Sequence, residues 1–510
     1  MAYADRNSGS SEARELFRSV PAALSPLAVV DIGSNSVRLV IYDGPWRRAY
    51  ALHNEKTICA IGRNMVRTGH LDPEGAKLAL ATLARFRLVA EAHGVRTYEA
   101  VATAAARDAA NGAEFVREGE KLLGARIRIL SGEDEARIAA EGVLAGIPGA
   151  DGVAADLGGG SLDIVTLREG RTGAAETLPF GPLRLMDISD GDLSKARSAV
   201  AKGLEKSKLA GSLKGRALYA VGGIWRALAR VDMEQEDYPL HVLHHYTIPA
   251  SRALKLCKVV SGLSRKSLDK MKSVPKRRAE ALPYGALVLE QMIQVFGLKE
   301  AVVSAYGLRD GLLFRMLSRE EAAKDPLIEF ARDWNARESR SPGHAEELFG
   351  WMGPLFPKES QAERRIRLAA CLMYDIGWRR HPDDRALGAF QQVLRGAYAG
   401  ADHHERAVLA SATYYRYAGD GDLPEKLGID RLLGEDGAER ALKIGLAERL
   451  AYSICGALSG ELAATPLRVS GQSLVLEVPK RRQALLGEGV LKRLNDLAKA
   501  AGRRPETAVV

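Results

Sequence analysis

Two stretches of the sequence share one unusual pattern, and this repetition limits the possible folds more than any other feature. "VVDIGSNSVRLVIYD" at 29–43 and "AADLGGGSLDIVTL" at 154–167 each place an acid and small residues between apolar runs. Each pattern predicts a β-hairpin with a small polar turn. Asp31 and Asp156 head these turns, 125 positions apart. We therefore expect a duplicated α/β domain, each copy opening with such a hairpin.

Helix and strand signals fill in the rest of each copy. In the first, Asp72 and Pro73 open a helix that Gly94 ends, because Asp caps a helix and Pro suits its first position. Ser131 and Asp134 form a capping-box pattern at the start of another helix. In the second copy we predict helices near 192–208, from 224 and over 277–296, strands at 217–223 and 300–304, and a helix over 308–314.

The length of the chain and the changes in residue composition along it predict the domain organisation. A chain of 510 residues is too long for one ordinary domain. We expect five parts: a flexible tail at 1–27 that is not a signal peptide, α/β domains at 28–150 and 151–320, a mostly helical region at 321–465, and a small α+β piece at 466–510. The sequence contains no run of 18 or more apolar residues, so no membrane-spanning helix is predicted. Four cysteines without metal or redox spacing fit a reducing cytoplasm.

The charge distribution indicates an anionic partner. The net charge is +9, and residues 252–278 hold ten Lys or Arg with one acid, Asp269. That segment has no aromatic residue on which bases could stack, which argues against single-stranded nucleic acid. A solvated helix face explains the same charges equally well.

The two hairpin turns suit phosphate oxygens. Glycine and serine allow close backbone approach, so that successive N–H groups can surround an anion. An acid beside such a turn repels phosphate, but it could hold Mg²⁺ that bridges to the phosphate. A tight turn without a ligand remains an alternative for each hairpin alone. The predicted phosphate-binding residues of the turns, and of a third glycine loop, are Gly33, Ser34, Asn35, Ser36, Gly158, Gly159, Gly160, Ser161, Gly222 and Gly223.

Seven motifs occur in the order of a known family. They are "VVDIGSNSVRLVI", "VATAAARDAANGAEF", "ILSGEDEARI", "AADLGGGSLDIV", "YAVGGIWRALARV", "KRRAEALPYGALVLE" and "SAYGLRDGLL". The chain resembles the actin, sugar-kinase and chaperone ATPase superfamily. Within it, residues 28–320 resemble the exopolyphosphatase/guanosine pentaphosphate phosphohydrolase family. The resemblance implies an actin-like α/β fold of two domains.

The resemblance also implies roles for individual residues. Glu135 matches the glutamate that activates water, although the residues alone do not choose among it, Glu133 and Asp134. Asp156 matches an acid that positions metal and water, and Arg107 an arginine that holds phosphate. Metal ligation is expected from Asp31, Asp156 and Asp163, where Asp163 stands in place of the family's usual glutamate. Thr103 adds a hydroxyl.

The function implied is exopolyphosphatase activity. Water would attack the terminal phosphoryl of inorganic polyphosphate with Mg²⁺ or Mn²⁺, releasing orthophosphate. The expected contacts to the rest of the polymer are Arg63, Arg67, Lys276, Arg277 and Arg278. Hydrolysis of guanosine pentaphosphate is the alternative. More distant alternatives are a sugar kinase, against which bulky Trp225 argues after the glycine pair, and a non-catalytic phosphate sensor. A homodimer without nucleic-acid or membrane partners is expected.

The helical region resembles an HD-type domain with an incomplete signature. In "CLMYDIGWRRHP", Tyr374 stands where a metal-binding histidine would precede Asp375. His344, His381, His403 and His404 are the remaining candidate ligands. We expect a structural or dimer-forming role and no second metal centre.

Overall fold

A computed structural model describes residues 25–419, 421, 423 and 428–510. Most of the predicted tail at 1–27 lies outside these residues. The described chain forms two compact units, Ala23–Asp325 and Pro326–Val510, which are treated separately below. Within the described residues, the longest helices are too short or too polar to span a bilayer.

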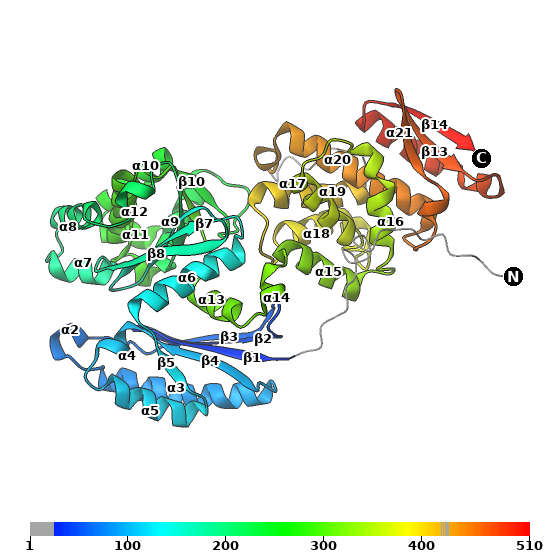
Figure 1. Cartoon of the computed structure of the whole chain (residues 1–510). Helices are drawn as coiled ribbons and strands as arrows, with labels where there is room; N and C mark the ends of the chain where they lie inside the picture. The colour runs from blue at the N-terminus through cyan, green and yellow to red at the C-terminus, as the bar shows by residue number, and fades with distance from the viewer. Residues whose placement is uncertain (1–24, 420, 422, 424–427) are drawn as a thin grey trace. The chain divides into compact units, whose positions relative to one another are not determined.

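The first sheet is built from the first predicted hairpin. Its strand order is β3-β2-β1-β4-β5, with antiparallel β1–β2 and β2–β3 pairs and parallel β1–β4 and β4–β5 pairs. α3 and α5 cover one face, and both run alongside the sheet in Figure 1. The elements are β1 (Leu27–Ile32), β2 (Ser36–Tyr42), β3 (Ala51–Ile58), α2 (Met65–Thr68), α3 (Pro73–Ala92), β4 (Thr97–Ala102), α4 (Ala104–Asp108), α5 (Gly112–Leu123), β5 (Ile127–Ile129) and α6 (Gly132–Gly146).

The second sheet repeats the first and adds one strand. Its order is β10-β11-β9-β6-β7-β8, so β8-β7-β6-β9-β11 matches β3-β2-β1-β4-β5 in order and in strand direction. The predicted duplication is therefore present. The elements are β6 (Gly152–Leu157), β7 (Leu162–Arg168), β8 (Arg171–Leu178), α7 (Pro182–Ile188), α8 (Leu193–Glu205), β9 (Ala217–Val221), α9 (Gly223–Gln235), β10 (Thr247–Pro249), α10 (Ala250–Gly262), α11 (Arg265–Lys270), α12 (Leu282–Phe296) and β11 (Glu300–Val303).

Two helices lie between the sheets. Ala136, Ala140 and Val143 of α6 pack with the strands of the second sheet. Ile138, on the opposite face of α6, packs with the first sheet together with Leu312 of α13 (Leu308–Arg315). Because α6 is apolar on both faces, it is held from both sides, and its first turn is presented where the two sheets meet.

Two local predictions need correction. The helix expected over 277–296 begins only at Leu282, because Lys276–Arg278 forms a separate 3₁₀ turn after Pro275. The exposed edge strands β3 and β8 were not predicted. Their residues do not alternate clearly between polar and apolar, since both faces of an edge strand are partly solvated.

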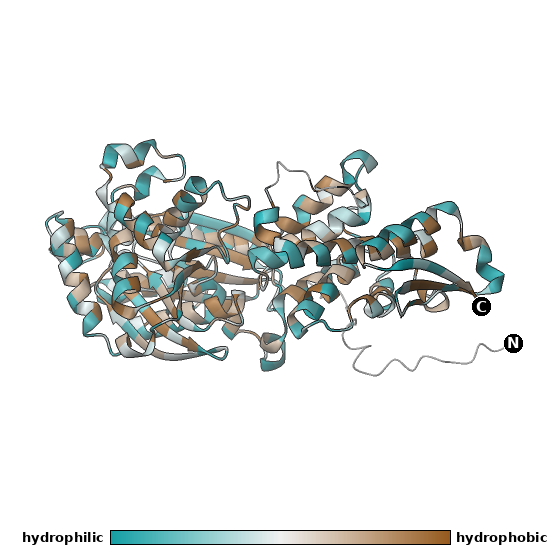
Figure 2. Cartoon of the chain, turned by 90° about the horizontal axis from the view of Figure 1, so that it is seen from above, coloured by the Kyte–Doolittle hydropathy of each residue, from teal (hydrophilic) through white to brown (hydrophobic). Residues whose placement is uncertain are grey.

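The second unit is helical and ends in a small sheet. Its outer helix faces are largely hydrophilic (Figure 2). The predicted hairpin around Ser470–Gln472 joins β12 and β13, and β14 completes the order β12-β13-β14. The elements, preceded by α14 (Arg319–Ala323), are α15 (Pro326–Glu338), α16 (His344–Trp351), α17 (Gln361–Leu372), α18 (Pro382–Leu394), α19 (His403–Ala418), α20 (Asp430–Cys455), β12 (Leu467–Ser470), β13 (Ser473–Val478), α21 (Glu488–Ala500) and β14 (Arg504–Val509). The domain boundaries at 150, 320 and 465 stay predictions.

Candidate active site

The second hairpin places two acids side by side. Asp156 of β6 and Asp163 of β7 are partners in the antiparallel register, so their side chains project from the same face. Ser161 donates a 3.0 Å hydrogen bond to Oδ2 of Asp163. The pKa of Asp156 is raised to about 6, mainly by burial and secondly by the charge of Asp163. The pair is therefore costly to keep fully ionised without a cation.

Glu135 reaches this pair from the first turn of α6. Ser131 caps the helix by accepting a 3.0 Å hydrogen bond from the Asp134 amide, as predicted. Burial raises the pKa of Glu135 to about 8, and the charges of Asp163, Asp156 and Asp31 add to the shift. The helix N-terminus favours the carboxylate, but burial and three acids outweigh it. Glu135, Asp156, Asp163 and Asp31 thus form one acid cluster.

The three consecutive acids of α6 differ in surroundings. Glu133 is exposed and pairs with Arg137, and Asp134 is engaged with the Ser131 cap. Of the three, Glu135 is the one whose charge is coupled to the acids of both hairpins. Glu135 therefore differs from its two neighbours in burial and in the charges around it, and its role as the residue that activates water stays a prediction.

Arg107 lies beside Glu135. Its guanidinium Nη1 stands 3.6 Å from Oε2 of Glu135 and donates to the Leu130 carbonyl at 3.1 Å. Nε is held by Asp108 at 3.0 Å. Thr103 is buried just before α4, and its amide donates to the Ile32 carbonyl, which ties it to the end of β1. Arg107 is thus fixed at the edge of the acid cluster with its fork only partly used.

The two predicted glycine turns have the same closure. The Gly33 amide donates to the Ser36 carbonyl, and the Gly158 amide donates to the Ser161 carbonyl, both at 3.0 Å. Ser34 and Asn35 are exposed in the first turn, and the glycines of the second turn are exposed as well. The first turn is held from behind by residues 59–62, whose amides donate to the carbonyls of Ser34 and Asn35. Arg63 and Arg67 are exposed close to that segment.

The third glycine loop lies against the second hairpin. Gly222 has a φ of 113°, and an added Cβ would stand 2.7 Å from the Leu157 carbonyl oxygen and 3.4 Å from Oδ1 of Asp156. Only glycine suits this close approach. A Cβ on Gly223 would collide with the guanidinium of Arg278, so that this arginine lies directly over the loop.

A row of basic side chains continues from the first hairpin. In the antiparallel register Asp31 of β1 faces Arg38 of β2, and Arg38 faces Lys56 of β3. Arg309 of α13 donates a 2.8 Å hydrogen bond to Oδ2 of Asp31. Burial lowers the pKa of Arg38, and the charges of Arg309 and Arg226 lower it further.

A second group of cations surrounds Arg278. Burial lowers the pKa of Arg278 to about 10, and the charges of Arg226, Arg277 and Arg230 add to the shift. Arg277 and Arg278 also depress the pKa of Lys56, after the effect of its burial. Lys276 is exposed in the same 3₁₀ turn. We call Arg38, Lys56, Arg226, Arg230, Arg277, Arg278 and Arg309 the cation cluster. Like charges held this close favour an anion between them.

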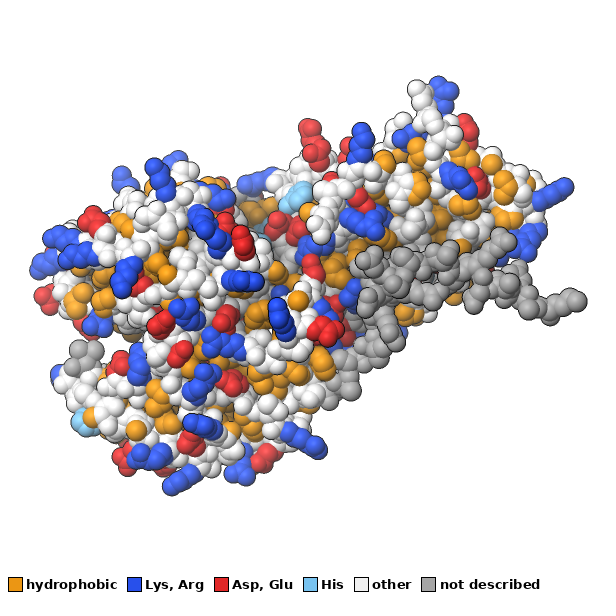
Figure 3. Space-filling view, in the orientation of Figure 1, with side chains coloured by type: hydrophobic (Ala, Val, Ile, Leu, Met, Phe, Trp, Pro, Cys, Tyr) orange, Lys and Arg blue, Asp and Glu red, His pale blue; other side chains and the backbone are white. Residues whose placement is uncertain are grey.

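This concentration is local. On the face drawn in Figure 3, blue Lys and Arg side chains alternate with red Asp and Glu over both units. The net charge of +9 therefore does not by itself identify a site. The cation cluster is identified by its mutual electrostatic effects, by the contact of Arg309 with Asp31, and by the electrostatic effect of Arg226 on Asp156.

The acid cluster suits a hard divalent cation in its chemistry. Carboxylate oxygens are the ligands that Mg²⁺ prefers, often one or two of them together with water and phosphate oxygens. Oδ1 of Asp163 is buried and makes no well-formed hydrogen bond, so it is free to take a further partner. Among the described residues, no three His, Cys, Asp or Glu side chains are already arranged around one point. The predicted ligand Asp31 is instead paired with Arg309.

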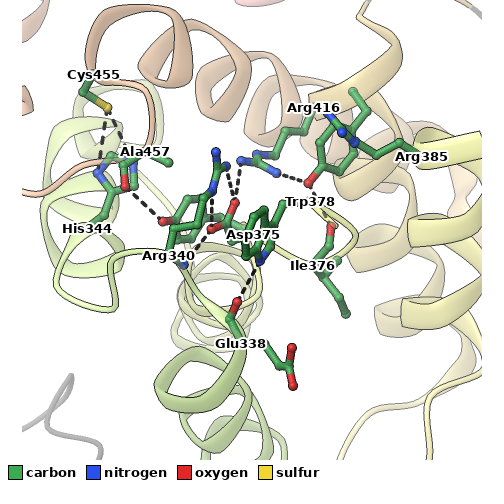
Figure 4. Close-up of polar contacts among 12 residues, drawn as sticks. Glu338, Arg340, His344, Asp375, Ile376, Trp378, Arg385, Arg416, Cys455 and Ala457 are labelled. Carbon is green, nitrogen blue, oxygen red and sulfur yellow. Dashed lines mark hydrogen bonds and ion pairs between the residues drawn. The ribbon is translucent and has the colours of Figure 1, made fainter. Parts of the chain in front are cut away.

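Asp375, a buried acid of the helical second unit, is surrounded by arginines. Figure 4 shows Asp375 between Arg340 and Arg416. Arg340 donates from Nη2 to Oδ1 at 2.6 Å and from Nε to Oδ2 at 3.0 Å, and Arg416 donates to Oδ1 at 3.3 Å. These bonds outweigh burial and lower the pKa of Asp375.

The histidines of that region do not gather at Asp375. His344 is buried near Cys455, and burial lowers its pKa to about 4. His381 caps α18, and His404 bonds the Leu432 carbonyl. His403 is buried at the start of α19.

Several site residues escaped the sequence analysis. Arg38, Lys56, Arg226 and Arg309 were not named, although a signal existed for Arg38. It lies seven positions after Asp31, as Asp163 lies seven after Asp156, so that the two hairpins align residue by residue. Trp225 was misjudged: it is fully buried, and its Nε1 donates to the Gly285 carbonyl, so it packs in the core and crowds no ligand.

Similar proteins with known structures share the fold of the first unit. An exopolyphosphatase from Cytophaga hutchinsonii superposes with a TM-score of 0.52 at 22% identity, over 57% of this chain and 97% of that one. The Aquifex aeolicus member of the Ppx/GppA family gives a TM-score of 0.51 at 24% identity, over 57% and 96%. Together with the repeated sheets, these likenesses confirm the predicted actin-like α/β fold.

Sequence relatives extend the comparison. Exopolyphosphatase 2 of Mycobacterium tuberculosis is 28% identical over 313 residues, which are 57% of this chain and 98% of that protein. A guanosine-5'-triphosphate,3'-diphosphate pyrophosphatase of Aeromonas hydrophila is 26% identical over 382 residues, 69% of this chain and 73% of the relative.

Family models cover nearly the whole described chain. Residues 327–508 match the family described as "Exopolyphosphatase, C-terminal". Residues 40–320 match the family described as "Ppx/GppA phosphatase family", and this range holds every member of the acid and cation clusters except Asp31 and Arg38. The predicted resemblance is confirmed, and the chain belongs to the Ppx/GppA phosphatase family of hydrolases.

Proposed function

We propose that this protein is an exopolyphosphatase that hydrolyses the terminal phosphoryl group of inorganic polyphosphate. The observation that carries the proposal is the junction of the acid cluster with the cation cluster. Arg226 and Arg309 of the cation cluster act electrostatically on Asp156 of the acid cluster. A terminal phosphoryl group would lie at the acids with its cation, and the next phosphates of the chain would meet the arginines.

Glu135 is the proposed general base. It would orient a water molecule and take its proton as the water attacks in line with the departing phosphate oxygen. Burial and the neighbouring acids raise the pKa of Glu135 to about 8, and positive charge bound at the acids would lower it toward neutral pH, where a carboxylate accepts a proton from water most effectively. No covalent phospho-enzyme is needed, because water itself is the nucleophile.

The remaining residues would neutralise charge. Arg107, beside Glu135, would bind an oxygen of the transferred phosphoryl group, and the amides of the turns at 33–36 and 158–161 would bind others. Mg²⁺ or Mn²⁺, when bound, supplies positive charge at the phosphoryl oxygens. Asp156 and Asp163 would hold it, with Asp31 as a third candidate ligand.

Hydrolysis of guanosine pentaphosphate is the second candidate. The relative from Aeromonas hydrophila named for that activity aligns over 69% of this chain, beyond the 57% that aligns with exopolyphosphatase 2. The cation cluster favours the polymer, since it offers more positive groups than one short phosphate chain can engage.

The two candidates separate in one assay. Orthophosphate release is measured from long-chain polyphosphate, from triphosphate and from guanosine pentaphosphate at equal concentration of terminal phosphoryl groups, with Mg²⁺ present. Fastest release per enzyme from the long polymer supports the proposal. Fastest release from the nucleotide supports the second candidate. Normal turnover of polyphosphate by the Glu135→Gln variant would remove the mechanism.

The rest of the predicted biology is proposed with the function. We propose an HD-like identity for the helices of the second unit, without a metal centre of its own, and a homodimer. Location in the cytoplasm is supported by the four cysteines, all of which are free and buried.

A further inference from the structure

One ion pair joins the two repeats at the site. Nη1 of Arg309 donates to Oδ2 of Asp31 at 2.8 Å, across 278 positions of sequence. Asp31 ends the first strand of the first sheet, whereas Arg309 lies in α13, which follows the last strand of the second sheet. Both side chains are largely buried, with 16% and 23% of their surface exposed.

The pair stands between opposite charges. Arg309 acts electrostatically on Arg38, Arg226 and Lys56 of the cation cluster and on Asp156 of the acid cluster. Burial opposes its charge, and Asp31 and Asp310 more than offset that effect, so that its pKa is raised. Arg309 thus makes a direct contact between the two clusters.

The ion pair limits what Asp31 can do. Its carboxylate is already neutralised by a guanidinium, which weakens its attraction for a divalent cation. Among the residues that the structure describes, the cation at close range to the other three acids is Arg107, which stands 3.6 Å from Glu135. An incoming phosphate would compete for Arg309, since a guanidinium binds phosphate oxygens as well as it binds a carboxylate.

We propose that Arg309 is a positioning residue that exchanges partners. In the resting protein it holds Asp31 and keeps this acid from the cation; when an oligophosphate binds, Arg309 turns to a phosphate oxygen and releases Asp31 as a metal ligand. The ligand class rests on the proposed function. The occupation of Asp31 by Arg309 does not, and it can be measured without any substrate.

The same helix offers a matched control. Arg315 of α13 pairs with Glu141 of α6 through two hydrogen bonds, and both side chains are partly exposed. This pair also links α13 to a neighbouring element, but the charges that act on Arg315 are those of Glu141, Asp134 and Glu99, none of which belongs to the acid cluster. Arg315→Gln therefore removes a comparable ion pair between α13 and α6 without changing a residue of the site.

The experiment measures Mn²⁺ binding by calorimetry and electron paramagnetic resonance, in the absence of phosphate. Arg309→Gln should bind Mn²⁺ about five- to tenfold more tightly than the unchanged protein, because Asp31 is released. Arg309→Lys keeps a positive partner and should bind as the unchanged protein does, and so should Arg315→Gln. In Arg309→Gln combined with Asp31→Asn the gain should vanish.

The affinity for polyphosphate should change in the direction opposite to the affinity for Mn²⁺. Arg309→Gln should raise KM for polyphosphate about tenfold or more, since a charge-assisted contact to phosphate is lost. Tighter metal binding together with weaker substrate binding is the signature of the exchange, and a merely structural role would weaken both. Equal or weaker Mn²⁺ binding by a folded Arg309→Gln variant would overturn the proposal. If no polyphosphate is hydrolysed by any variant, the function fails while the Mn²⁺ result still decides the exchange.

Discussion

Asp156 and Asp163 face each other across β6 and β7, at the register position where the first hairpin has Asp31 opposite Arg38. The second hairpin therefore brings two negative charges together, whereas in the first hairpin a positive charge stands opposite the negative one. One turn of the duplicated pair is suited to a cation and the other to an anion. A symmetric duplication has in this way become a site with two chemically different sides.

Glu135→Gln should abolish most of the hydrolysis. Removal of a general base typically costs a factor of about 10² to 10⁴ in rate, and the glutamine keeps the size of the side chain. Orthophosphate release gives the rate, and binding of the polymer should persist. Glu133→Gln, on the exposed side of the same helical turn, is the control and should change the rate by less than about twofold. Equal losses in both variants would contradict the assignment.

Glu135→Gln should also make the metal-free protein more stable at high pH. The pKa of Glu135 is raised to about 8, so the folded state holds its proton where the unfolded state, near 4.5, has lost it. The free energy of unfolding therefore falls as pH rises from about 4.5 to 8. Glu135→Gln removes this loss, and we expect about 2 kcal/mol more stability at pH 8 with little change at pH 4.5. Chemical denaturation at both pH values, with chelator present, tests this; a destabilised variant at pH 8 would contradict it.

Charge reversal in the 3₁₀ turn at 276–278 should weaken long polyphosphate more than triphosphate. Lys276→Glu, Arg277→Glu and Arg278→Glu together remove part of the cation cluster. The expected change is at least about tenfold in KM for the long chain, with a shallower dependence on salt concentration. Reversal of three exposed lysines nearby, Lys266, Lys270 and Lys272, changes net charge equally and is the control. Equal effects of the two triple variants would favour a general charge effect.

Gly223→Ala should displace Arg278 while leaving the fold intact. The new Cβ meets the flexible end of that arginine, and φ at this position is not in the left-handed region. We expect KM for polyphosphate to rise about three- to tenfold at unchanged thermal stability, since one phosphate contact is misplaced. Gly262→Ala, with open space around its Cβ, is the control. An unchanged KM in Gly223→Ala would show that Arg278 does not contact the substrate.

Asp375→Asn should destabilise the second unit. The amide cannot balance Arg340 and Arg416, of which Arg416 is fully buried, and an unbalanced buried charge costs about 3 kcal/mol. Urea denaturation followed by the fluorescence of Trp378, which stacks on Arg340, reports this loss. Asp383→Asn is the control, because that carboxylate is almost fully exposed. A stability change below about 0.5 kcal/mol would contradict the role of Asp375.

The duplication and the residues of the turns could be predicted from the amino-acid sequence alone. The acid–glycine hairpins, the helix caps at Asp72 and Ser131, and the strand–loop–helix joint at Gly222 are local features, since each depends on backbone preferences within a few residues. Such preferences can be read without the fold. The edge strands β3 and β8 could not, because their pairing depends on a neighbouring strand and their own pattern is weak.

Which charged side chains come together follows from the three-dimensional fold and could not be predicted from the sequence. Arg309 and Asp31 are 278 positions apart, and Glu135 is coupled to Asp163 and Asp156 through the place of α6 between two sheets. Electrostatic effects act through space and depend on distance and burial, neither of which sequence spacing gives for residues in different elements. The residue types were visible from the start, whereas their partners and their altered pKa values follow from the packing of the two repeats.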